Sequence, residues 1–236
     1  MNRKGQSRRI AARQIAGVGL LACLPTSLTA TSIDDVRQPG SFDRLSVGIP
    51  AQVNVVLGSK SEVRLSAEKQ VLDSLAVSVA DGELQIRSTK GYSTQQAVNI
   101  VVMTPSLKAV NGHGAVSLQI DKLHADNFIV RGADSADIQL NDVNLRVLMS
   151  DLSGSSSMTL AGQVASQQVK LSDSASYDAE NLTGQSAVLK VSGAADAVVR
   201  VSDQLDVTIK GAGSVEYIGD PVVKKKIGEA ASLDQR

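Results

Sequence analysis

The chain has 236 residues, as many basic as acidic residues, and a formal net charge of zero. Its hydrophobic content of 42% is too high for a disordered chain, and its length suits one domain with or without an appendage. Zero net charge, with no basic stripe along the sequence, argues against a nucleic-acid partner, which requires Lys and Arg clustered on one face.

The first residues have the pattern of a secretory signal peptide. Residues 1–14 are rich in Lys and Arg and contain no acidic residue, and the apolar run Ile15–Leu24 follows them. This run is too short to span a membrane stably, which takes ~20 residues. We therefore expect a signal peptide within residues 1–32 and an exported mature chain in the periplasm or at the cell surface.

Cys23 is the only cysteine of the chain, so no internal disulfide can form. It ends the segment "LLAC", which is similar to the lipobox of bacterial lipoproteins, where the cysteine becomes the lipidated N-terminus. The alternative is an ordinary signal peptide that is cleaved near residues 30–32 and contains a cysteine by chance. With lipidation, the protein would be an outer-membrane lipoprotein, and this anchor would be its only membrane contact.

Residues 42–108 are predicted to form an N-terminal β region with antiparallel or mixed pairing. Five short segments alternate apolar and polar residues, which is the period of a half-buried strand: VNVVL, EVRLS, AVSVA, ELQIR and VNIVV. Asp81–Gly82, between two of them, indicates a tight hairpin. Ala67–Leu75 is expected to form one short helix, because its apolar residues share a face. We expect this region to pack on the first coil of the next segment and to shield its open edge.

Residues 109–220 repeat with a period near 20 residues, which is typical of a solenoid. When the repeats are aligned by their turn, successive turns are 20, 20, 19, 20 and 18 residues apart and one position holds only Gly or Asp: Gly114, Asp134, Gly154, Asp173, Gly193 and Gly211. Gly adopts a positive φ freely, and Asp tolerates it better than most residues. We therefore predict a positive φ at all six turn positions.

Each turn is followed by two apolar positions separated by one polar residue, and a second alternating segment leads into the next turn. One such coil cannot bury its apolar face alone, whereas coils stacked about 4.8 Å apart form a continuous core and pair as parallel sheets. The predicted fold is all-β, a right-handed parallel β-helix of about 20-residue coils, because parallel crossovers are nearly always right-handed. Residues 221–236 are expected to be a polar tail with a solvated Lys run.

The segments "FDRLSVGIPAQVNVVLG", "VADGELQIRS" and "VNIVVMTPSLKAVNGHGAVSLQI" resemble the bacterial family described as "putative auto-transporter adhesin, head GIN domain". The resemblance covers about residues 42–218 and continues through the later Gly-Ser-Ala turns. It implies an exported protein with a right-handed β-helix, and the family brings no catalytic motif to this chain. The turns are not uniform, since Leu152 stands where the first two coils have Gly112 and Gly132.

Candidate residues for chemistry are few. His113 and His124 are the only histidines, and without a Cys or a third His to join them we expect both to face solvent. Asp134 and Asp137 lie in a segment loosely similar to calcium-binding Gly/Asp repeats and could form only a weak local site. Asp196 lies three coils from Asp137, about 14 Å away at the usual strand spacing, too far to share an ion. We expect no metal, cofactor or catalytic residue.

Two classes of function follow from these observations. The first is a non-enzymatic envelope or surface protein, an adhesive or scaffolding module that binds an envelope or extracellular ligand through flat sheet faces. The alternative is a polysaccharide-acting lyase or hydrolase, which would need a carboxylate pair or a base with a metal in a groove. The lack of Trp, the short turns and the lack of a long loop favour the first class. The ligand and the oligomeric state are beyond the sequence.

Overall fold

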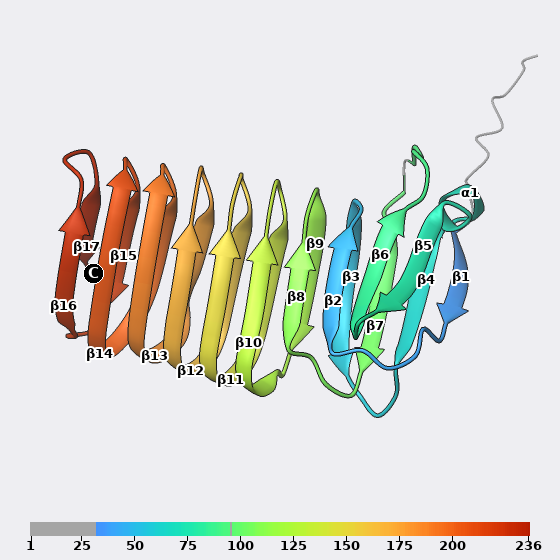
Figure 1. Ribbon diagram of the computed structural model, residues 1–236, viewed down its shortest axis with the longest axis horizontal. Coiled ribbons are helices and arrows are strands. Elements are labelled where there is room, and N and C mark those ends of the chain that lie inside the picture. The colour runs from blue at the N-terminus through green and yellow to red at the C-terminus, as the bar shows by residue number, and fades with distance from the viewer. Residues whose placement is uncertain (1–31, 95) are drawn as a thin grey trace, which may run out of the picture. The chain divides into compact units, whose positions relative to one another are not determined.

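The computed structural model describes residues 32–94 and 96–236, in which nearly all regular structure is β. Strands lie side by side along one axis in this part of the chain (Figure 1). The one helix of these residues, α1 (Lys69–Leu72), has four residues, and no helix here is long and apolar enough to cross a membrane. The N-terminal strands are β1 (Ser32–Arg37), β2 (Arg44–Gly48), β3 (Ala51–Leu57), β4 (Glu62–Glu68), β5 (Leu75–Ala80), β6 (Glu83–Ser88) and β7 (Asn99–Thr104). The strands that follow are β8 (Ala109–Gly112), β9 (Val116–Asp121), β10 (His124–Gly132), β11 (Asp137–Leu152), β12 (Ser157–Leu171), β13 (Ser176–Gly193), β14 (Asp196–Gly211), β15 (Ser214–Ile218), β16 (Val222–Ile227) and β17 (Ser232–Gln235).

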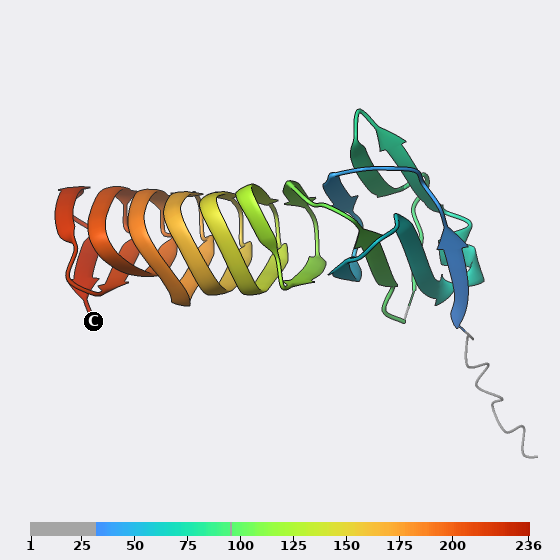
Figure 2. The same cartoon turned by 90° about the horizontal axis from the view of Figure 1, so that it is seen from below.

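Each coil contributes one segment to each of two sheets, which we call sheet I and sheet II. Sheet I contains β8, β10, the C-terminal parts of β11 to β14, and β16. Sheet II contains β9, the N-terminal parts of β11 to β14, β15 and β17. Corresponding segments of successive coils pair in parallel, so that Val130 lies beside Ser150 and Ser150 beside Val169. The predicted β-solenoid is confirmed, and Figure 2 shows its coils winding one after another.

The order of the strands in the stack differs from their order in the sequence at the N-terminal end. The coil formed by β2 and β3 lies between two others, because β2 pairs with both β6 and β8, and β3 with both β7 and β9. Beyond it, β5 and β6 form an antiparallel hairpin, and β4 pairs antiparallel with β1 and β7. At the hairpin turn, Asp81 and Gly82 both have positive φ, at 50° and 76°, as a tight type I′ turn requires. Through β2 and β3 the N-terminal region covers the edge of the first coil of the following segment, formed by β8 and β9, as expected.

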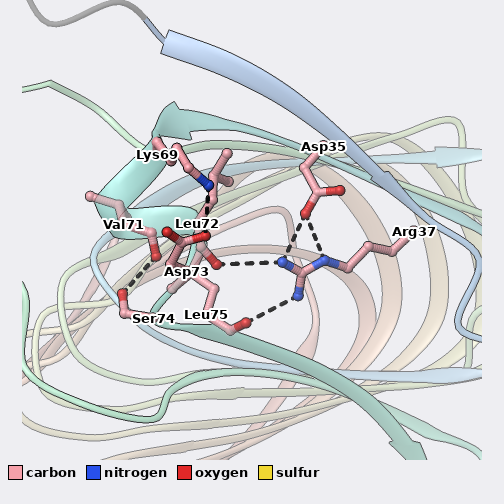
Figure 3. Close-up of polar contacts among 8 residues, drawn as sticks. All are labelled: Asp35, Arg37, Lys69, Val71, Leu72, Asp73, Ser74 and Leu75. Atoms are coloured by element: carbon pink, nitrogen blue, oxygen red, sulfur yellow. Dashed lines mark hydrogen bonds and ion pairs between the residues drawn. The ribbon is translucent and has the colours of Figure 1, made fainter.

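The helix is shorter than the sequence pattern suggests. Ala67 and Glu68 belong to β4, where they pair with β1, so that only Lys69–Leu72 is helical. The predicted helix over Ala67–Leu75 is therefore wrong at both ends, because strand pairing with a segment far away in the sequence competes for the same backbone groups. Arg37 of β1 donates hydrogen bonds to the carbonyl oxygens of Leu72 and Leu75, at 3.5 and 3.0 Å (Figure 3).

The segment expected to be a polar tail continues the solenoid. β16 pairs in parallel with β14, and β17 pairs in parallel with β15, so that residues 222–235 form a further coil. The Lys run at 224–226 lies on β16, and its backbone is hydrogen-bonded to the coil before it. The predicted end of the coils at residue 220 is wrong, because backbone pairing with an existing edge does not require strongly apolar side chains.

The six turn positions all have positive φ, from 62° at Asp134 to 115° at Gly211. The Asp residues also link neighbouring turns. The Asp134 carboxylate accepts a hydrogen bond from the backbone N–H of Gly114 at 3.0 Å, and the Asp173 carboxylate accepts one from Gly154 N–H at 3.1 Å. Asp at this position therefore both tolerates the left-handed turn and ties it to the turn of the preceding coil.

The core is the space between the two sheets, and apolar side chains fill it. Leu160 and Val199 are buried there, while Thr159, which neighbours Leu160 in the chain, is exposed. One buried pair is polar: the Tyr177 hydroxyl donates a hydrogen bond to Gln167 Oε1 at 2.8 Å. Burial raises the pKa of the Tyr177 phenol well above its ordinary value.

Candidate functional site

The residues that the sequence singles out for chemistry do not come together. Cys23 lies outside the described residues. His113 and His124 are exposed, at the turn before β9 and at the start of β10. Asp137 accepts hydrogen bonds from Ser157 at 2.7 Å and from the Gln139 amide, within the outer surface of sheet II. In the part of the chain that the structure describes, no group of three or more His, Cys, Asp or Glu side chains is placed to hold a metal ion.

Charged side chains are sorted between the two sheets of the solenoid. The segments of sheet I carry eight Lys or Arg residues (Arg131, Arg146, Lys170, Lys190, Lys210, Lys224, Lys225 and Lys226) and three acidic ones (Asp126, Asp151 and Asp206). The segments of sheet II carry one basic residue, Arg200, and six acidic ones (Asp121, Asp137, Asp178, Asp196, Glu216 and Asp234). Asp142, Glu180 and Asp203 also lie in β11, β13 and β14, but they are unpaired at the corners between the two sheets. Without these corner residues the difference is plus five (8 − 3) on sheet I and minus five (1 − 6) on sheet II.

Most of the positive charge on sheet I is not neutralised locally. Lys170 pairs with Asp151 at 3.3 Å, and Arg146 lies 3.8 Å from Asp126. The other cations of sheet I are exposed and form no ion pair with any described residue: Arg131, Lys190, Lys210, Lys224, Lys225 and Lys226. Lys225 lies in the inward-facing row with Leu189 and Val207, and the other cations belong to outward rows. The outer surface of sheet I from β10 to β16, which we call the basic face, therefore carries more positive than negative side chains.

The basic face also exposes apolar side chains. Met149 and Val188 are 39% and 40% exposed, and they lie in one outward row of the sheet with Ile129 and Gln168. These side chains line a shallow hollow of about 300 Å³, together with the adjacent outward row of Arg131, Asp151, Lys170 and Lys190. Apolar side chains exposed among charged ones are typical of an interaction surface. Parallel pairing on both sides holds β11 to β13 in place, so this surface is built on a rigid element.

A second hollow, of about 640 Å³, follows the corner where the chain passes from sheet II to sheet I. A polar row lines it, formed by Asn144, Gln163, Thr183 and Arg200, which lie beside one another on successive coils. The Arg200 guanidinium donates to the carbonyl oxygen of Glu180 at 2.8 Å, which fixes its position. This corner offers amide, hydroxyl and guanidinium groups that could bind an uncharged polar ligand.

Sequence reasoning missed the basic face, and its premise that the chain has no basic stripe is wrong for the folded protein. The signal was present in the repeat alignment. The position three residues before each turn residue holds Asn111, Arg131, Asp151, Lys170, Lys190 and Thr208, which form one outward row of sheet I. The position three residues after it holds only Ser or Asp, on sheet II. Comparing the charges at these two positions would have found the two faces.

Known proteins confirm the fold. A solved structure described as a putative adhesin from Bacteroides fragilis has a TM-score of 0.81 and 17% identity, with 87% of this chain and 97% of that chain covered. A putative lipid binding protein from Parabacteroides distasonis has a TM-score of 0.73 and 17% identity, with 88% and 98% covered. A putative adhesin from Parabacteroides merdae has a TM-score of 0.67 and 15% identity, with 88% and 97% covered.

A search of curated proteins finds no match to the chain. The model of one protein family matches residues 41–221, which is most of the sequence and includes both the N-terminal β region and nearly all of the coils. The matched range agrees with the resemblance seen in the sequence. The chain belongs to the family "Putative auto-transporter adhesin, head GIN domain".

Proposed function

We propose that the protein is an exported, non-enzymatic binding module of the cell envelope or cell surface, and that the basic face is its binding surface. The observation that carries the proposal is the combination of Met149 and Val188, both exposed, with cations that have no ion-pair partner among the described residues. Burying such a surface against a ligand removes apolar area from water and matches its charge at the same time. Membership of an adhesin family supports a binding role rather than a catalytic one.

The binding role is tested on isolated cell envelopes. The mature chain is mixed with envelope fractions, the bound fraction is measured by sedimentation, and the supernatant is assayed for released sugar ends. We expect saturable retention without release of sugar. Two positive charges of the face are removed in Arg131→Gln/Lys190→Gln, which should be retained less than the wild type, and Thr159→Gln, on sheet II, serves as the control. Sugar release that grows with time, or equal retention of all variants, would contradict the proposal.

Export is tested separately, at the N-terminus. Mass spectrometry of the protein from an exporting host is expected to give one of two mature forms. Either Cys23 is acylated and is the first residue, or the chain begins near residues 31–33. An intact Met1 on the exported protein would contradict cleavage of a signal peptide.

A further inference from the structure

We propose that the basic face docks on the surface of an anionic lipid bilayer, with Met149 and Val188 reaching the boundary between headgroups and acyl chains. This inference rests on the proposed function and names the partner of the same surface. It also differs from the expectation that a lipid anchor at Cys23 would be the only membrane contact. Three features of the face carry it: its distance from the acidic sheet, its flatness, and the mixture of cations with apolar side chains.

The distance between the sheets explains how a chain of zero net charge can bind an anionic surface. Packed sheets lie about 10 Å apart, and the outward side chains add to that separation. The Debye length at physiological ionic strength is about 8 Å. A bilayer that contacts sheet I therefore experiences the excess of positive charge on its outer surface, while the acidic groups of sheet II are largely screened. The acidic residues of sheet II also orient the molecule, because an anionic bilayer repels sheet II and attracts sheet I.

The distribution of cations fits a plane better than a line. The first outward row along the solenoid axis contains Arg131, Lys170, Lys190 and Lys226. Lys224 lies in the row that contains Met149 and Val188, and Lys210 lies in a third row, beside Ser192. A linear polyanion following the first row would also meet an acidic residue in it, Asp151. A flat anionic surface contacts the rows together. Lys and Arg around exposed apolar side chains are the composition that binds at the headgroup level of membranes.

A second copy of the chain fits the face less well. Its acidic sheet II would match the charge of the basic face, but it offers little for the apolar side chains to contact. Large apolar residues of β8 to β17 that are more than one-third exposed all lie on sheet I: Met149, Val188, Val222 and Ile227. Val56 and Val101, which are similarly exposed, lie on β3 and β7 of the N-terminal region and not on the acidic part of sheet II. A lipid surface accepts both the charges and the apolar groups.

The experiment compares two double variants with the same net charge in vesicle co-sedimentation. Lys190→Gln/Lys210→Gln removes two positive charges from sheet I, and Gln139→Glu/Thr159→Glu adds two negative charges to sheet II. All four positions are exposed, so both variants are expected to fold. The vesicles contain phosphatidylcholine with or without 30% phosphatidylglycerol. Circular dichroism and thermal midpoints verify folding, and a Met149→Ser/Val188→Ser variant tests the apolar contribution at constant charge.

The wild type is expected to bind the anionic vesicles and to dissociate from them as the salt concentration rises. It is not expected to bind neutral vesicles. Each lysine near an anionic surface changes the partition coefficient about fivefold, so the Lys variant is expected to lose about 25-fold. The sheet II variant should stay within about twofold of the wild type, because its added charges lie beyond a Debye length. The Met149→Ser/Val188→Ser variant is expected to bind anionic vesicles more weakly than the wild type.

Several results would overturn the inference. Equal binding by the two charge variants would show that net charge, not the face, matters. Failure to bind anionic vesicles, with capture of soluble polygalacturonate or DNA, would make the partner a polymer. Failure to bind vesicles, with salt-sensitive self-association in sedimentation velocity, would make it a second copy. In each of these cases retention by whole envelopes still tests the proposed function independently, so the two failures can be told apart.

Discussion

Replacing Gly154 by Ala is expected to destabilise the solenoid more than replacing Gly114 by Ala. Both glycines occupy the turn position, and their φ angles are similar, at 71° and 78°. Their surroundings differ. A Cβ added at Gly154 would lie 2.8 Å from the carbonyl oxygen of Asp134 and 3.0 Å from its Cα and N, whereas a Cβ added at Gly114 would meet nothing within 4 Å. Comparing the two variants therefore separates the cost of backbone strain from the cost of close contact between stacked coils.

The magnitudes follow from these two terms. An L-residue in the left-handed region costs about 1–2 kcal/mol, and this cost is common to both variants. Overpacking against atoms that cannot move away costs about 1–3 kcal/mol more. The backbone at Asp134 is held by hydrogen bonds to both neighbouring turns: its carbonyl oxygen accepts from Ser155 N–H at 2.6 Å, and Ser135 N–H donates to the carbonyl oxygen of Gly114 at 3.2 Å. We expect Gly114→Ala to lower the free energy of unfolding by about 1–2 kcal/mol. Gly154→Ala should lower it by about 2–5 kcal/mol.

Urea and thermal unfolding followed by circular dichroism measure the difference. For a chain of this size about 1 kcal/mol corresponds to ~2–4 °C in the thermal midpoint. The Gly154→Ala midpoint should therefore lie about 4–8 °C below that of Gly114→Ala if the extra cost is about 2 kcal/mol. An unchanged urea slope verifies that both variants unfold from the same state. Equal midpoints for the two variants would refute the argument that coil stacking at this turn excludes a Cβ.

Three further outcomes are expected. Leu160→Asp places an unpaired charge in the core and should lower the free energy of unfolding in urea by several kcal/mol. Thr159→Asp, at an exposed position, should lower it by about 0.5 kcal/mol or less. Equal midpoints for the two variants would show that the strand register is wrong. Burial raises the pKa of Tyr177 above the ordinary value of 10.0, so the unfolded chain loses that proton first as pH rises. The free energy of unfolding should therefore fall above about pH 10, and Tyr177→Phe should make this fall shallower. Parallel pH curves for the two proteins would contradict this expectation. Asp134→Gly should change the thermal midpoint little, because two effects oppose each other. The variant removes the backbone strain of a non-glycine residue at positive φ, and it loses one exposed hydrogen bond of about 0.5–1.5 kcal/mol. A large drop in the midpoint would show that the hydrogen bond contributes more to stability than the strain costs.

The repeat made the solenoid predictable, because each coil is built from local signals that recur in the chain. Alternation of apolar and polar residues assigns Leu160 to the core and Thr159 to solvent within a single strand. The Gly-or-Asp position indicates a left-handed turn without any knowledge of the neighbouring coil. The observed φ of 62° at Asp134 and 71° at Gly154 follows from the same steric rule that the sequence argument uses.

The pairing between distant segments could not be predicted from such signals. Alternation identifies β2 as a strand, but it does not say that β2 lies between β6 and β8. The extension of β4 through Glu68, and with it the start of α1 at Lys69, depends on β1, which lies some thirty residues earlier. The strand at Val222–Ile227 likewise forms on the edge that β14 provides. In each case the structure depends on hydrogen bonds between backbone groups of distant segments. The side chains of these segments do not indicate which partner strand they pair with.

The sequence by itself determined the class of fold, the coil period and the conformation of the turns, because these depend on residues within one coil. It also determined the family, through the N-terminal segments and the coils together. The tertiary structure alone decided where the charges lie. A net charge of zero conceals an excess of five positive charges on one sheet and five negative charges on the other. Residues such as Lys170 and Lys190 become neighbours only because parallel pairing places equivalent positions of successive coils about 4.8 Å apart.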